Sequence, residues 1–255
     1  MVIGRPASKE AEVPYLCINS ILFNMTELCK ASDNMWELIV AHPVLLLIMN
    51  RFGLSLGVGD KTVQEACKER QIDENTFLAV INLTINESEE YTVSPEEISL
   101  KSLTTYLMNA HAYFFNFRYP SIRQKLIDAI DRSDAQFYAL MLRYYDEYVN
   151  ELKLHTEFEE KTIFARVDSN LKEEVQVHTP IGNLHRWHEQ IAMKMNEIKN
   201  IIIKYFPPNE DSSALNLAVY DLFACEEEFN NHCRIEDLLL TPAILANEIK
   251  AKKKR

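Results

Sequence analysis

Glycine is scarce in this chain, which has only 5 glycines among 255 residues. A β protein built from hairpins needs glycine at many turns, because tight hairpin turns require backbone angles that other residues adopt at a cost. The scarcity therefore argues against a hairpin-rich β fold. The apolar share of 47% is ordinary for a globular protein, so a sizeable core is available. We expect an all-α protein.

The chain also lacks an excess of basic charge and any long apolar run. Its net charge of −11 opposes binding along a nucleic-acid backbone. The lysine-rich end, 250–255, is interpreted as a solvated helix terminus whose cations complement the helix dipole, with a binding tail as the alternative. The longest apolar run, 39–49, contains His42 and Pro43 and is too short to cross a bilayer. We expect neither a nucleic-acid nor a membrane partner.

The cysteines form no C-x-x-C pair, and their number, 5, is odd. No secretory leader precedes them, so we interpret them as free thiols in a reducing compartment. By exclusion, we expect a cytoplasmic protein. The cysteines are Cys17, Cys29, Cys67, Cys225 and Cys233.

Composition and cap signals divide the chain into four parts. These are an N-terminal extension at 1–32, a small helical domain at 33–85, a linker at 86–98 and a four-helix bundle at 99–250. The helix signals of the small domain are Asp33 before a helix over 35–40, Gly53 after a helix over 43–51, a Thr62–Glu65 capping box before a helix to residue 70, and Asp73 before a helix to residue 82.

Four long segments with apolar residues every three or four positions follow the small domain. They cover about 95–131, 133–167, 183–205 and 212–250. Short connections between long helices favour an up-down-up-down bundle. Pro120 falls inside the first segment, where we expect it to bend or interrupt the helix.

Two of these segments repeat one pattern, a histidine four residues before a glutamate. The pairs are His155 with Glu159 and His232 with Glu236. Residues four apart share a helix face, with Cβ atoms about 5–6 Å apart, so each pair can offer an imidazole and a carboxylate to one point. A single such pair is often only a solvated surface pair, whereas two pairs favour a metal site.

Two further histidines, His111 and His188, precede the two pairs at equal intervals along the chain. His185 lies three residues before His188 and stays an alternative ligand, because it could share that helix face. Iron accepts mixed imidazole and carboxylate donors, and a glutamate has two oxygens with which to bridge two ions. Four histidines and two glutamates on four helices therefore predict two bridged non-heme iron ions in the bundle.

Other polar residues near these positions are expected to play lesser roles. Glu157, Glu160 and Asp237 are interpreted as groups that support the ligands or face solvent. Cys233 follows His232 directly and points about 100° away on the helix, so we do not expect it to be a ligand. Neighbouring aromatic and aliphatic side chains are expected to limit water and to hold the imidazoles in place.

The bundle resembles the hemerythrin-like domain. The resemblance rests on the motifs Asn109-Ala110-His111, His155-x-x-x-Glu159-Glu160 with Ile163-Phe164, Trp187-His188-Glu189, and His232-x-x-x-Glu236 with Leu239-Leu240-Thr241-Pro242. Trp187-His188-Glu189 favours His188 over His185. The resemblance implies a ligand set of His111, His155, Glu159, His188, His232 and Glu236.

The small domain resembles the one that precedes the hemerythrin-like domain in the "repair of iron centers" (RIC) proteins. This resemblance rests on His42-Pro43, Asn50-Arg51-Phe52-Gly53 and residues 61–67. This resemblance implies a di-iron protein of the nitrosative and oxidative stress response that helps to repair iron-sulfur clusters, with nitric oxide or dioxygen as ligand and iron-sulfur proteins as partners.

Two positions depart from the RIC pattern. That family commonly has adjacent cysteines after its Phe-Gly element, but the corresponding stretch here, 56–59, has none. Ala165 stands where the family often has proline, a change expected to affect only helix geometry. A gas or redox sensor, or an oxygen-binding or iron-storage protein without catalysis, is therefore the alternative function. Enzymatic turnover and a homodimer are both left open.

Overall fold

The computed structural model describes residues 28–86, 91–130, 135–165, 167, 184–206 and 213–253. These residues form helices and a single isolated antiparallel bridge between Asn34 and Thr62. The predicted all-α fold is confirmed. Most of the predicted N-terminal extension lies outside the described residues.

Four short helices make up the N-terminal part, and the cap signals explain most of their ends. Thr62 and Glu65 form the predicted capping box, and Asp73 caps the next helix through the Thr76 amide. Gly53 adopts a φ of +79°, as expected for a left-handed helix terminator. The helices are α1 (Met35–Ala41), α2 (Leu45–Arg51), α3 (Val63–Arg70) and α4 (Glu74–Ile85).

The prediction that Asp33 caps the first helix is wrong by one residue. The side-chain oxygen of Asn34 accepts the hydrogen bond from the Trp36 amide at 3.0 Å. Asp33 turns back instead and accepts from the Lys30 amide at 2.7 Å. Both residue types are good caps, so local sequence did not separate them.

The first long helix begins later than the start of the periodic segment at about residue 95. Residues Pro95–Glu97 form only a 3-10 turn, η1, and the first long helix starts at Leu100, where the Ser99 hydroxyl accepts from the Ser102 amide at 3.3 Å. The bundle helices are α5 (Leu100–Tyr113), α6 (Tyr119–Ala129), α7 (Ala135–Phe158), α9 (Leu184–Tyr205), α10 (Ser213–Ile235) and α11 (Thr241–Lys253).

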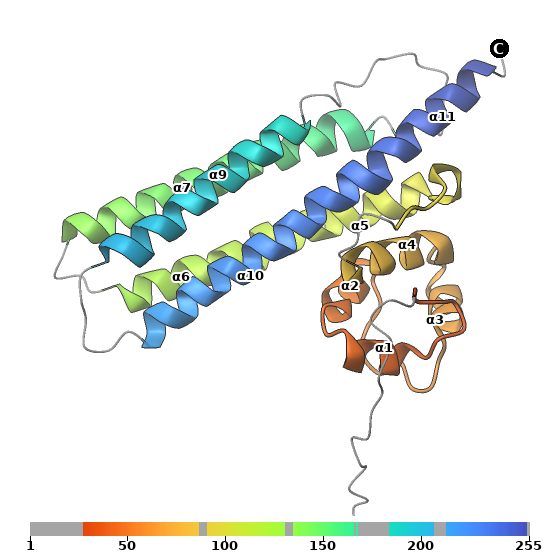
Figure 1. Cartoon of the computed structure of the whole chain (residues 1–255), viewed down its shortest axis with the longest axis horizontal. Coiled ribbons are helices and arrows are strands. Elements are labelled where there is room, and N and C mark those ends of the chain that lie inside the picture. Colours follow the sequence, from red (N-terminus) through yellow and green to blue (C-terminus); the bar gives the residue numbers. More distant parts are fainter. Residues whose placement is uncertain are drawn as a thin grey trace, which may run out of the picture.

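Figure 1 shows these helices as a four-membered up-down-up-down bundle. The first member is α5 continued by α6, and the fourth is α10 continued by α11. Helix α7 packs against α9 and α6, and α10 packs against α6 and α9. The short N-terminal helices lie beside one end of the bundle, where α2 contacts α5 and α4 contacts α10.

Within the described residues, three of the four bundle members contain a π-helical turn. These turns are η2 (Phe114–Arg118), η3 (Glu159–Phe164) and η5 (Glu236–Leu240). In a regular helix the ring of Pro120 or Pro242 would meet the carbonyl four residues earlier, inside η2 or η5, and the wider turn provides room. The α-helical pattern is therefore interrupted by η2 just before Pro120, as expected, and the chain continues beyond it as α6. Turn η3 forms before Ala165 without a following proline.

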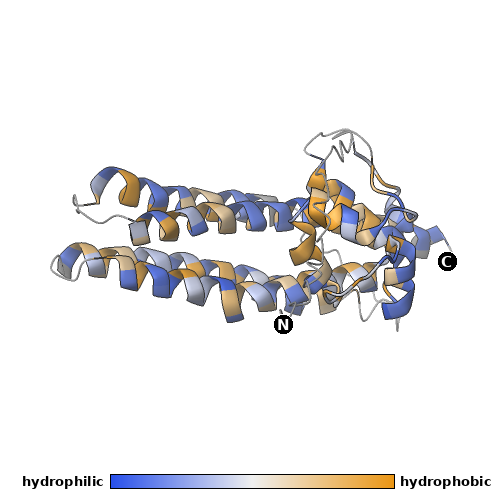
Figure 2. Ribbon diagram, turned by 90° about the horizontal axis from the view of Figure 1, so that it is seen from below, coloured by the Kyte–Doolittle hydropathy of each residue, from blue (hydrophilic) through white to orange (hydrophobic). Residues whose placement is uncertain are grey.

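Buried apolar side chains form two clusters along the bundle. The first joins the N-terminal helices to the near ends of the bundle, through side chains such as Leu107, Phe164 and Leu239. The second fills the far part of the bundle and includes Ala110, Leu152 and Phe229. Figure 2 shows hydrophobic and hydrophilic residues mixed along each bundle helix, as expected where one face of a helix is buried.

Because the first cluster is shared, the N-terminal helices pack directly onto the bundle. The division into domains at 86–98 remains a prediction. No helix among the described segments is long and apolar enough to cross a membrane.

The capping box at Thr62 gives a direct test of the N-terminal part. Thr62→Ala removes the oxygen that accepts from the Glu65 amide, so the free energy of unfolding should fall by about 1 kcal/mol. Urea denaturation of the full chain followed by circular dichroism measures the change. Thr105→Ala is the control, because that exposed hydroxyl only donates to the Lys101 carbonyl within its own helix. Equal midpoints for Thr62→Ala and the wild type would contradict the assignment.

Candidate metal centre

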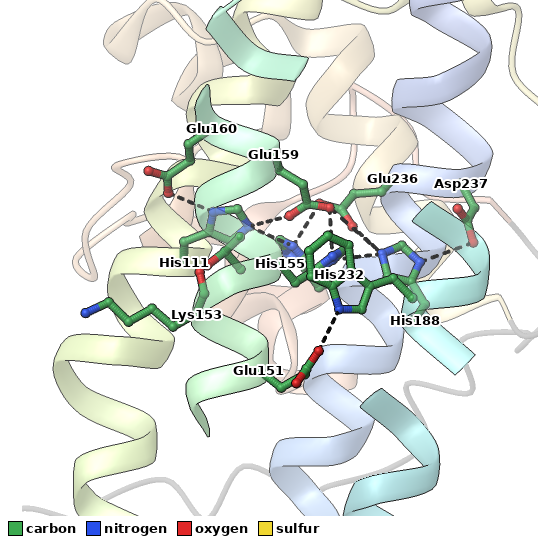
Figure 3. Close-up of polar contacts among 12 residues, drawn as sticks. His111, Glu151, Lys153, His155, Glu159, Glu160, His188, His232, Glu236 and Asp237 are labelled. Atoms are coloured by element: carbon green, nitrogen blue, oxygen red, sulfur yellow. Dashed lines mark hydrogen bonds and ion pairs between the residues drawn. The ribbon is translucent and has the colours of Figure 1, made fainter. Parts of the chain in front are cut away.

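Four histidine and two glutamate side chains meet inside the bundle, and all four members of the bundle contribute to the group. Figure 3 shows them pointing toward one another at one level of the bundle. Each is at most 7% exposed. They are His111 on α5, His155 on α7, Glu159 on η3, His188 on α9, His232 on α10 and Glu236 on η5.

These side chains form two groups with ligand spacing. One group contains His111 and His232, the other contains His155 and His188, and both contain Glu159 and Glu236. Within each group, the candidate ligand atoms all lie within 4.8 Å of one another. Each group therefore combines two histidines of its own with the two carboxylates that both groups share.

The distances between nitrogen atoms support a common metal ion within each group. The Nε2 atoms of His111 and His232 are 3.1 Å apart, and so are those of His155 and His188. Two donors bound at right angles to one ion, each about 2.1 Å from it, are separated by about 3 Å. The imidazole pairs are therefore spaced as neighbouring ligands of one ion.

The carboxylates are near these nitrogens but have no hydrogen bond of good geometry. His155 Nε2 is 3.0 Å from Glu159, and His232 Nε2 is 3.0 Å from Glu236. Among the described residues, no donor satisfies either oxygen of either glutamate. A buried carboxylate is costly unless it is paired or coordinates a metal. These oxygens therefore fit a site for cations.

His111 and His188, the two histidines that are not part of a His-x-x-x-Glu pair, each turn Nδ1 toward an acidic residue. His111 Nδ1 hydrogen-bonds to Glu160 at 2.9 Å, and His188 Nδ1 lies 3.7 Å from Asp237 (Figure 3). Each acid directly follows one shared glutamate, so the two halves of the site have the same layout. Such partners fix the ring orientation and increase the basicity of a ligand. Glu157 instead faces solvent and pairs with Lys161 at 2.7 Å.

Aromatic rings pack around the imidazoles. Phe164 stacks on His111 with centroids 5.7 Å apart, and Phe229 stacks on His232 at 6.0 Å. The Trp187 ring meets His155 edge-on at 5.0 Å. The polar layer of ligands therefore lies between the two apolar clusters, where its rings have little freedom to turn.

Burial and charge act in opposite directions on the ionisation of the site. Burial lowers the pKa of His232, and it would lower that of His188 too, but contacts with Asp237, Cys233 and the shared glutamates raise the His188 pKa well above its usual value. Burial opposes ionisation of Glu236, yet His232 and His188 hold its pKa well below the usual range. The glutamate is therefore ready to act as an anionic ligand.

Two contacts in this region were not expected from the sequence. Glu151 accepts hydrogen bonds from Trp187 Nε1 at 3.3 Å and from Lys194 at 3.0 Å, and so holds the ring that packs on His155. Its position one helical turn before His155 was the available signal. The second contact is the Glu160–His111 bond, which joins two helices and has no local signature. The side chain of His185 and all of His178 lie outside the described residues.

Comparison with known protein families matches residues 102–244 to the hemerythrin HHE cation binding domain. The match covers more than half of the chain. The chain belongs to this hemerythrin family. No curated protein matches the chain. The hemerythrin domain contains all six side chains of the site, and the name of the family agrees with a cation at this position. Membership therefore makes this a metal-binding protein with a hemerythrin-like bundle.

We expect His188, and not His185, to be a ligand of the hemerythrin-type site. His188→Ala should lower the metal content after anaerobic loading and reduce the rise in melting temperature on metal addition, because a weaker site stabilises the fold less. His185→Ala is the matched control. Elemental analysis and differential scanning fluorimetry measure both effects. Metal loss in His185→Ala with full loading of His188→Ala would reverse the assignment.

We expect Glu160→Ala to weaken metal binding without removing a ligand. Loss of the acceptor for His111 Nδ1 should lower the metal affinity by about 10–100-fold. Competition with a chromophoric chelator measures the affinity. Glu157→Ala removes a nearby solvated acid and should leave it unchanged. Equal affinities for the Glu160→Ala and Glu157→Ala variants would show that Glu160 has no role in orienting His111.

Proposed function

We propose that this protein is a non-heme di-iron protein of the nitrosative and oxidative stress response. In this proposal the iron ligands are His111, His155, Glu159, His188, His232 and Glu236. The observation that carries it is the pair of four-donor groups that share two buried carboxylates. Mixed nitrogen and oxygen donors suit iron, with nitrogen–nitrogen distances appropriate to neighbouring ligands.

Each side chain has a role that follows from its position. The two glutamates would bridge the ions. His111 and His232 would bind one ion, and His155 and His188 would bind the other. Glu160 and Asp237 would orient His111 and His188. When bound, the iron pair would supply redox chemistry and open positions for a small ligand. The stacked aromatic rings would limit the access of water.

The burial of the site favours a small ligand. All six side chains are at most 7% exposed. Neither of two surface pockets, at 57–69 and at 220–230, includes any of them. A diatomic gas needs far less space than a drug-sized molecule, whose sites measure about 300–1,000 Å³. Nitric oxide and dioxygen are therefore the proposed ligands.

The resemblance to RIC proteins extends the proposal to repair of damaged iron-sulfur clusters, with iron-sulfur proteins as partners in the cytoplasm. Thiol chemistry in the N-terminal part has little support. The stretch 56–59 has no cysteine. Burial raises the pKa of Cys29 to about 11 and that of Cys67 to about 12, so both thiols stay protonated at neutral pH.

This absence of a reactive thiol near 56–59 favours the alternative, a gas or redox sensor, or an oxygen-binding or iron-storage protein, without catalysis. In the sensor, binding at the iron site would shift the packing of the N-terminal helices for a partner to detect. Either function is compatible with a monomer or a homodimer.

Iron loading followed by gas mixing tests the proposal. The anaerobically loaded protein should contain about two irons per chain. Stopped-flow mixing of the reduced form with nitric oxide and with dioxygen should give a new absorption spectrum with at least one gas. Restoration of a damaged iron-sulfur enzyme by the pure protein would favour repair, whereas a partner captured only with intact iron ligands would favour sensing. Clearly fewer than two irons would overturn the dinuclear site.

A further inference from the structure

Arg51 is a charged residue in an apolar setting, at the point where the N-terminal helices meet the bundle. It is the last residue of α2, next to the turn at Gly53, and it is only 5% exposed. A buried cation is costly unless it has close partners, and removing one partner leaves an uncompensated charge. The partners of Arg51 therefore show what this residue holds in place.

The guanidinium of Arg51 contacts the bundle. One nitrogen is 3.2 Å from Glu228 on α10. The guanidinium carbon lies 5.2 Å from the ring centres of both Tyr113 and Phe114. The backbone carbonyl of Arg51 accepts a hydrogen bond from the side chain of Asn109 at 2.8 Å. Arg51 therefore joins α2 to two separate bundle helices.

The residues that Arg51 contacts flank two of the candidate ligands. Asn109 and Tyr113 lie two residues before and two residues after His111. Glu228 lies one helical turn before His232 on the same helix. Phe114, whose ring Arg51 contacts, also touches a candidate ligand. Its ring meets the His232 ring edge-on, with centroids 6.0 Å apart.

Glu228 also connects Arg51 to the π-helical turn that follows His111. Arg118, the last residue of η2, places Nε 3.2 Å from the second oxygen of Glu228 and also contacts Asp221. Both arginines are thus attached to one largely buried carboxylate. Their shared partner therefore links the wide turn η2 to α10, the helix that carries His232.

We propose that Arg51 is a positioning residue through which the N-terminal helices set the geometry of the metal centre. The Arg51–Glu228 pair holds α5 and α10 at the distance that brings His111 and His232 together. Loosening of the N-terminal helices releases both ligand-bearing helices at this end of the bundle. The effect on metal geometry rests on the proposed function. The coupling of the N-terminal helices to α5 and α10 through Arg51 does not.

Two variants and two controls test this coupling. Arg51→Met keeps the apolar stem but removes the charge, and Glu228→Gln keeps the volume of the carboxylate. The control for the second is Glu227→Gln, since Glu227 is the next residue before Glu228 on the same helix but is exposed. The control for the first is Arg123→Met, because Arg123 makes an exposed pair with Asp146 at 2.7 Å.

The first measurement is hydrogen exchange of the full-length, metal-free protein. Arg51→Met and Glu228→Gln should each raise exchange at least about tenfold in peptides that cover 100–118 and 225–240, because the two helices lose their common anchor. The controls should leave both peptides unchanged. Faster exchange confined to 33–85 in Arg51→Met, with 100–118 and 225–240 unaffected in both variants, would overturn the proposal.

The second measurement uses Co²⁺ as an optical probe of ligand geometry. Arg51→Met and Glu228→Gln should shift the visible bands of the Co²⁺-loaded protein while the number of bound ions stays that of the wild type. Unchanged bands would contradict positioning of the ligands. Failure of the wild type and the controls to bind Co²⁺ would count against the proposed metal centre, and the exchange result would still decide whether Arg51 couples the N-terminal helices to the bundle.

Discussion

The burial of Glu159 and Glu236 is the constraint on which the rest of this structure depends. Two carboxylates, each about 1% exposed, lie in the middle of a helical bundle with no hydrogen-bond donor of good geometry among the described residues. Such groups are stable only near positive charge. The histidines supply part of it, and a cation in each four-donor group would supply the rest. The surrounding packing fits this requirement, since apolar clusters lie on both sides of the ligand layer.

Packing and electrostatics are connected at the end of the bundle that meets the N-terminal helices. The first apolar cluster includes side chains from those helices and from η3, η5 and α11. Phe164 belongs to that cluster and stacks on His111. The N-terminal helices therefore contribute to the surroundings of the site although they supply none of its candidate ligands. Stability of this part and order in the ligand layer are expected to change together.

The ligand residues could be found from the sequence because their spacing is local. His155 with Glu159 and His232 with Glu236 are four residues apart, so any helix places each pair on one face. Cap signals at Thr62 and Asp73 were equally local and correct. Contacts between helices were not accessible in this way. Neither the bond from His111 to Glu160 nor the pairing of Arg51 with Glu228 follows from periodicity, because both depend on how the bundle packs. The choice of Asn34 over Asp33 as a cap also depended on which side chain faced the helix.

The π-helical turns were not predicted either, and they have a consequence for how this bundle can vary. A turn with one surplus residue rotates the chain beyond it by about 100° relative to a regular helix. Turns η3 and η5 begin at Glu159 and Glu236, so the face that each helix presents beyond the ligands is out of phase with the face before them. Segments on the two sides of the layer can therefore acquire different surface residues without moving a donor atom. Deleting a single residue there would leave the composition almost intact and yet turn the end of the helix away from its neighbours, so length in these two stretches is constrained more tightly than residue identity.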